Sequence, residues 1–79
     1  MVVGHLWRYA RRDSIMTNMD LMLEIRRLIQ KKNNYYGNGI GSRPTAAEQD
    51  EEDMYERELK KRGVVGRIYN KLWNESLIA

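Results

Sequence analysis

The sequence predicts an all-α protein of three to four short helices, arranged as an antiparallel helical hairpin or a three-helix bundle. Apolar residues recur at spacings of three and four in several windows, and the two-residue alternation of a β-strand is absent from all of them. Two capping boxes, Thr17 with Asp20 and Thr45 with Glu48, mark helix starts. At 79 residues the chain is predicted to be one domain, 1–79, near the size at which a single core is only just sufficient.

The first two helices are predicted at residues 1–12 and 15–32. Residues 1–12 contain no acidic residue and repeat apolar residues at helical spacing, which indicates a basic amphipathic helix. The central helix, 15–32, is expected to pair with it and to end at Asn33 and Asn34. Its apolar arc covers more than half the circumference and comprises Ile15, Met19, Leu21, Met22, Leu23, Ile25, Leu28 and Ile29. An arc this wide predicts neighbours on two sides, supplied by the rest of the chain or by a partner.

A Gly-rich loop is predicted at residues 35–44, because three glycines and a proline leave too much backbone entropy for a regular element. The following helix, 45–62, is acidic first and basic last, an order that suits the helix dipole. Two pairs at i,i+4 spacing, Glu56 with Lys60 and Glu58 with Arg62, are expected to support it. Gly63 ends it, and an amphipathic helix is predicted at 64–78.

Composition argues against an enzyme. The chain has no Cys and a single His, His5, so neither a Cys nucleophile nor a disulfide nor a zinc site of usual type is available. The carboxylates of the acidic helix are expected to face solvent. We therefore expect no catalytic residue, no metal, no cofactor and no small-molecule substrate. No apolar run approaches the roughly 18 residues of a membrane-spanning helix, so no transmembrane segment is expected.

Two sets of residues are candidates for binding. Large aromatic side chains and neighbouring arginines are typical of protein interfaces, and they predict a partner-binding set of Trp7, Arg8, Arg12, Tyr69 and Trp73. Basic residues interleaved with tyrosines are typical of RNA-binding surfaces. They predict an alternative nucleic-acid-binding set of Arg8, Arg11, Arg12, Arg26, Arg27, Lys31, Lys32 and Arg43.

One resemblance to a known family is carried by the first 33 residues. Leu6-Trp7-Arg8, followed by Arg12, resembles the opening of the LYR family, in which Leu-Tyr-Arg/Lys precedes an Arg four residues on. Ile25-Arg26-Arg27-Leu28-Ile29, leading into Lys32 and Asn33, is similar to a second element of that family. Trp stands in place of the family's Tyr, and Ile29 or Leu28 in place of its Phe. The resemblance implies a mitochondrial accessory or assembly protein of three helices that docks onto larger assemblies and an acyl-carrier protein. It assigns the motif positions to Leu6, Trp7, Arg8 and Ile29, and so adds Leu6 and Ile29 to the partner-binding set.

The sequence thus favours a non-enzymatic helical accessory, adaptor or assembly subunit that binds a larger protein complex. A mitochondrial location follows only from the resemblance and the basic N-terminus; the chain is otherwise expected in the cytoplasm. Two alternatives remain open: a structural RNA-binding subunit of a ribosome or other RNP, and a small viral or phage protein that binds a host factor.

Overall fold

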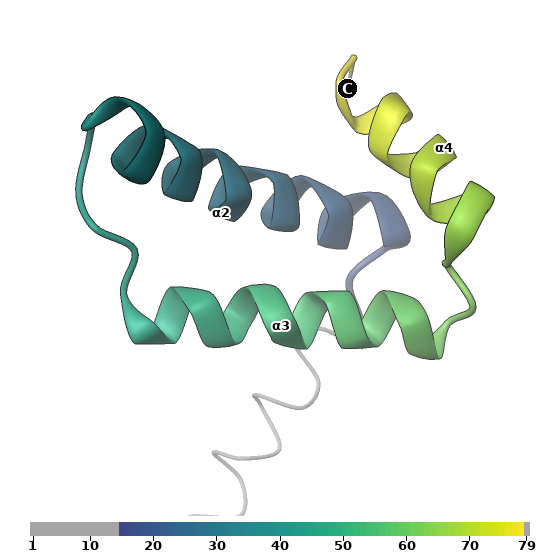
Figure 1. Ribbon diagram of the computed structural model, residues 1–79. Coiled ribbons are helices and arrows are strands. Elements are labelled where there is room, and N and C mark those ends of the chain that lie inside the picture. The colour runs from purple at the N-terminus through teal and green to yellow at the C-terminus, as the bar shows by residue number, and fades with distance from the viewer. Residues whose placement is uncertain (1–14, 79) are drawn as a thin grey trace, which may run out of the picture.

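The computed structural model describes residues 15–78, and in that part of the chain every regular element is a helix. Helix α2 spans Asn18–Asn38, α3 spans Ala46–Lys61 and α4 spans Gly66–Ser76. Helices α2 and α3 run antiparallel, side by side, and α4 leans against the end of the hairpin where α2 begins (Figure 1). The predicted all-α class and the helical hairpin are confirmed. The predicted helix at 1–12, and its pairing with the central helix, lie outside the described residues.

Both capping boxes form as the sequence predicts. The Thr17 hydroxyl accepts from the Asp20 backbone N–H at 3.0 Å, and the Asp20 carboxylate accepts from the Thr17 N–H at 3.2 Å. Thr45 and Glu48 repeat this exchange at 3.1 and 3.0 Å. Each box satisfies backbone donors that the first helical turn leaves without partners, so these two threonines fix where α2 and α3 begin.

The predicted end of the central helix is wrong. It continues through Asn33 and Asn34 to Asn38, and Gly39, with φ of 65°, ends it by donating to the carbonyls of Asn34 and Tyr35. Asparagine is only a weak helix former, and the intrinsic penalty of about 0.5 kcal/mol per residue is too small to stop a helix that packs against a neighbour. The Gly-rich loop predicted at 35–44 is therefore shorter, because its first residues belong to α2.

Two other predicted boundaries also shift. The first helix of the hairpin begins at Asn18 rather than at residue 15, so Ile15 precedes it and is 78% exposed instead of joining the apolar arc. The last helix begins at Gly66 rather than at residue 64, because Gly63 at φ 80° and an extended Val65 form the turn from α3. Val64 lies in that turn, where its side chain is buried.

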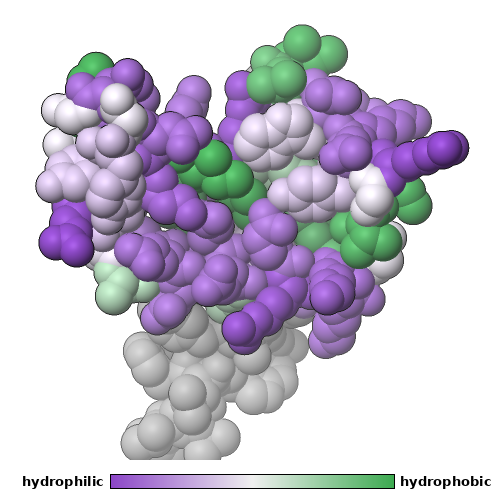
Figure 2. Space-filling model, in the orientation of Figure 1, coloured by the Kyte–Doolittle hydropathy of each residue, from purple (hydrophilic) through white to green (hydrophobic). Residues whose placement is uncertain are grey.

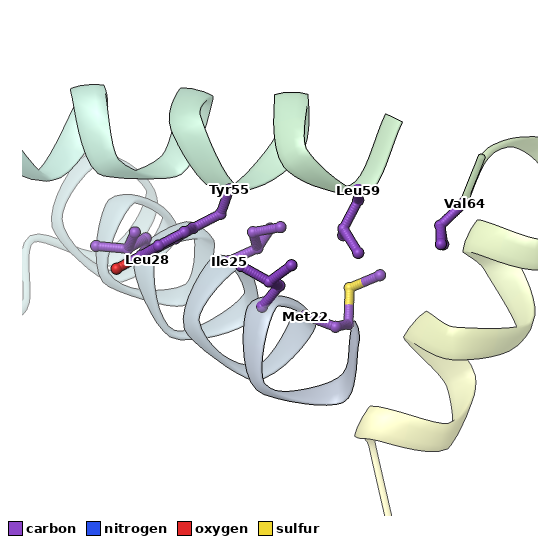
Figure 3. Close-up of a cluster of buried hydrophobic side chains, with 7 residues drawn as sticks. Met22, Ile25, Leu28, Tyr55, Leu59 and Val64 are labelled. Atoms are coloured by element: carbon purple, nitrogen blue, oxygen red, sulfur yellow. The ribbon is translucent and has the colours of Figure 1, made fainter. Parts of the chain in front are cut away.

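The core lies between the two long helices and is closed at one end by the turn into α4. Tyr55 and Leu59 point from α3 toward Met22, Ile25 and Leu28 of α2, with Val64 beside Leu59 at the end of the hairpin nearest α4 (Figure 3). A second row of partly buried side chains packs around this cluster: Met16, Ile29, Met54, Tyr69, Leu72 and Trp73. The central helix therefore contacts neighbours on two sides, α3 and α4, as its wide apolar arc predicts.

Polar contacts hold the hairpin at both ends. Near the loop, Lys31 Nζ lies 2.8 Å from both carboxylate oxygens of Glu48. At the opposite end, Arg62 donates to the Met16 carbonyl at 2.7 Å and to Asn18 Oδ1 at 3.0 Å. The predicted pair of Glu58 with Arg62 is present at 3.3 Å and orients this arginine. Since the two contacts lie at opposite ends of the hairpin, they fix the register of α3 against α2.

Candidate functional site

Helix α4 carries two of the seven candidate partner-binding residues, Tyr69 and Trp73. Tyr69, Leu72 and Trp73 turn inward and pack against the core, and Ser76 is buried at the last turn. The opposite face of α4 is polar and comprises Arg67, Asn70, Lys71, Asn74 and Glu75. This amphipathic pattern is the one that the sequence predicts. The structure adds that the inward face is only partly covered.

An apolar groove lies where α3 turns into α4, and we call it the α3–α4 groove. It has a volume of about 340 Å³ and is lined by Glu56, Arg57, Lys60, Val64, Val65, Gly66 and Tyr69. Val65 is 50% exposed there, and the next apolar residue of the helix, Ile68, is 61% exposed. In Figure 2, apolar side chains lie at the right of the molecule, near the turn from α3 to α4, next to polar side chains over α3.

Gly66 shapes one wall of this groove. Its φ of 55° lies in the left-handed region, which side chains other than glycine rarely adopt. A Cβ at this position would meet no atom within 4 Å, so the space above the backbone of Gly66 is open. The first turn of α4 therefore offers a stretch of backbone that another chain can approach closely, between the side chains of Val65 and Tyr69.

Tyr69 connects the two helices that form the groove. Its hydroxyl donates to Glu56 Oε1 at 2.7 Å, which links α4 to α3. Partial burial, the bond to Glu56 and the negative charge nearby all raise the pKa of the Tyr69 hydroxyl, so it stays protonated through the ordinary range of pH. The predicted pair of Glu56 with Lys60 is absent, and Glu56 instead accepts the Tyr69 hydroxyl.

Arg26 joins α4 to α2 on another side of the same helix. Its guanidinium donates to the Ser76 carbonyl at 2.7 Å and lies 5.9 Å from the centroid of the Trp73 ring. A cation beside the last carbonyls of a helix is favourable because the helix dipole is negative there. Arg26 thus serves the fold, although the sequence suggests it equally well as a contact for nucleic acid.

Several of the other predicted nucleic-acid contacts also have partners within the chain. Lys31 pairs with Glu48, Lys32 with Glu52 at 3.0 Å, and Arg27 with Glu24 at 3.1 Å. The Lys31 ammonium and the Thr45 backbone lower the pKa of the Glu48 carboxyl, since both favour its charged form. Arg43 is exposed in the loop between α2 and α3, and Arg8, Arg11 and Arg12 lie outside the described residues.

The predicted partner-binding residues are divided in a similar way. Ile29, Tyr69 and Trp73 are all partly buried and pack against the same core cluster. Leu6, Trp7, Arg8 and Arg12 lie outside residues 15–78, so the resemblance to the LYR family stays a prediction. Sequence reasoning did not select Arg57, Lys60 or Val65. Arg57 and Lys60 are three residues apart on one helix, and this spacing could have indicated that they share a face. Their closeness to Val65 depends on the turn after α3, which the spacing does not predict.

Other kinds of site are not evident in residues 15–78. No group of three or more His, Asp or Glu side chains there is placed to hold a metal ion. None of the helices described is both long and apolar enough to cross a membrane. Comparison with protein-family models, with curated proteins and with solved structures gave no match. The α3–α4 groove is therefore the candidate functional site of the described residues.

Proposed function

We propose that this protein is a non-enzymatic helical adaptor or accessory subunit, and that it binds a segment of a partner protein in the α3–α4 groove. The observation that carries the proposal is the exposure of Val65 and Ile68 beside a groove with an apolar floor. Single exposed apolar residues are common on any surface. Here Val65 lines the groove together with Tyr69 and the cation Arg57, and aromatic and arginine side chains are enriched in protein interfaces.

The contacts of the basic residues favour a protein partner over RNA. Four of the eight cations in the nucleic-acid-binding set are held by groups of the chain itself: Arg26, Arg27, Lys31 and Lys32. A phosphate backbone would have to compete with these carboxylates and with the Ser76 carbonyl. An apolar floor also contributes little to the binding of phosphates, which depends on charge. The experiment must therefore distinguish a protein partner from the alternative, in which the chain is an RNA-binding subunit.

The proposal is tested by capture from an extract of the source cells on the immobilised full chain, comparing Val65→Asp with Asn74→Asp. Both variants add one negative charge, and Asp is a favoured N-cap residue, so the start of α4 tolerates it at position 65. We expect the wild type and Asn74→Asp to capture the same protein equally well, and ribonuclease should not release it. Val65→Asp should retain that protein about tenfold less well, because the variant buries a charge in the interface. Circular dichroism confirms that each variant is folded. Equal retention by Val65→Asp, or release by ribonuclease, would contradict the proposal.

A further inference from the structure

We infer that the segment bound in the α3–α4 groove is an acidic amphipathic helix. Its apolar residues would cover Val65 and the floor of the groove, and its carboxylates would pair with Arg57 and Lys60. This inference rests on the proposed function and adds the chemistry of the partner to it. It depends on three features: the unmatched cations of the groove, the open backbone at Gly66, and the absence of a free sheet edge in the described part of the chain.

The two cations of the groove have no carboxylate partner among residues 15–78. Glu56 accepts the Tyr69 hydroxyl at 2.7 Å, and Glu58 pairs with Arg62 at 3.3 Å. Arg57 and Lys60 are exposed, and neither forms an ion pair with any residue in 15–78. The charged residues that line the groove are two cations, Arg57 and Lys60, and one carboxylate, Glu56, so the lining has a net positive charge. Charge complementarity therefore favours a partner with carboxylates beside the two cations.

The shape of the site favours a helix over an extended peptide. An extended peptide usually adds to the edge of a sheet, where backbone groups are free, and residues 15–78 contain no strand. A helix presents side chains at i, i+3 and i+4 about 5–6 Å apart, a spacing that suits a short apolar floor between two helices. Gly66 leaves the backbone of α4 open at the centre of this floor, so a second helix can pack closely there.

The probes for the test are a synthetic amphipathic peptide of Leu and Glu, its counterpart of Leu and Lys, and an oligouridylate. Each is titrated into the isotopically labelled full chain, and backbone amide shifts are followed by NMR. We expect the Leu–Glu peptide to shift the amide signals of Val65, Gly66 and Tyr69. We also expect Arg57→Glu with Lys60→Glu to weaken this binding by about tenfold, because two attractive pairs become two repulsive ones.

Matched controls separate a specific site from general attraction between opposite charges. Arg67→Glu with Lys71→Glu makes the same change in net charge on the outer face of α4 and is expected to weaken binding by less than about twofold, as for charges distant from the contact. The Arg57→Glu, Lys60→Glu variant is expected to bind the Leu–Lys peptide in the same groove. Equal weakening by both double variants would overturn the inference, since binding would then follow net charge alone.

The remaining outcomes distinguish this inference from the proposed function. If the Leu–Lys peptide shifts the groove amides of the wild type as strongly as the Leu–Glu peptide, the acidic chemistry is wrong and the groove is still a binding site. If neither peptide binds there but capture remains sensitive to Val65→Asp, the inference fails and the proposed function survives. If oligouridylate shifts the same amides, the groove binds nucleic acid and both are overturned.

Discussion

Replacing Arg26 by Ala tests whether this arginine holds α4 in place. The substitution removes a charged donor from the Ser76 carbonyl and a cation from the Trp73 ring. A hydrogen bond to a charged group contributes about 1.5–3 kcal/mol, and a partly exposed cation–π contact about 0.5–1 kcal/mol. Arg26 is only partly buried, and water replaces part of what is lost. We therefore expect the free energy of unfolding to fall by about 1–3 kcal/mol.

Its neighbour Arg27 supplies the control. Within residues 15–78, the polar contact of Arg27 is a pair with Glu24 on one exposed helical face, and such pairs contribute about 0.5 kcal/mol or less. Urea unfolding of both variants, followed by circular dichroism, gives the comparison. With a slope of about 1 kcal/mol/M, typical of the smallest domains, the midpoint of Arg26→Ala should fall by about 1 M or more.

Fluorescence of Trp73 shows whether the loss occurs at α4. In a Trp7→Phe background, Trp73 is the remaining tryptophan. Arg26→Ala should change its emission under native conditions, because the ring loses a contact and α4 opens more often. Equal stability of Arg26→Ala and Arg27→Ala, with unchanged Trp73 emission, would refute the reasoning that Arg26 anchors this helix.

Two further predictions concern the core and the charged end of the hairpin. Leu59→Ala removes a fully buried side chain from the α2–α3 cluster, and urea unfolding should show a free energy of unfolding lower by about 2–5 kcal/mol. Leu23→Ala, at a residue that is 38% exposed, should lower it far less. Similar losses in the two variants would contradict the placement of the core. Because the pKa of Glu48 is lower in the folded protein than its ordinary value of 4.5, its contribution to stability is complete above that value and is lost as pH falls through the lowered pKa. Glu48→Gln should therefore be less stable than the wild type at neutral pH, and its melting temperature should depend less on pH between pH 2 and 6. An equally steep fall of the melting temperature with acid in both proteins would show that Glu48 does not titrate with folding.

Local signals predicted those parts of the fold that depend on a few adjacent residues. Thr17 and Thr45 start their helices because each capping box is completed within three residues, and Gly63 ends α3 for the same kind of reason. The end of α2 is different. Gly37, Gly39 and Gly41 all suggest a loop, but only the tertiary contacts decide how far the helix extends before a glycine takes a positive φ.

The candidate site was less predictable, because it depends on contacts between distant residues. The spacing of Tyr69 and Trp73 indicates an amphipathic helix, but it does not show which α3 carboxylate accepts the Tyr69 hydroxyl. A helix considered alone pairs Glu56 with Lys60, as i,i+4 residues often do. In the structure Glu56 instead accepts the Tyr69 hydroxyl, and Lys60 forms no ion pair with residues 15–78.

The positions of the hairpin's polar contacts also bear on the order in which the chain folds. Lys31 and Glu48 are 17 residues apart, whereas Arg62 and Met16 are 46 apart and Arg26 and Ser76 are 50 apart. Short loops cost less entropy to close, so the hairpin should grow from the Gly39 turn toward its open end, with α4 docking last. On this route the Lys31–Glu48 contact, which forms early, and the Arg26–Ser76 contact, which forms late, have different effects on the folding and unfolding rates. Weakening the Lys31 contact slows folding, whereas weakening the Arg26 contact speeds unfolding, so the lifetime of the native state depends on α4.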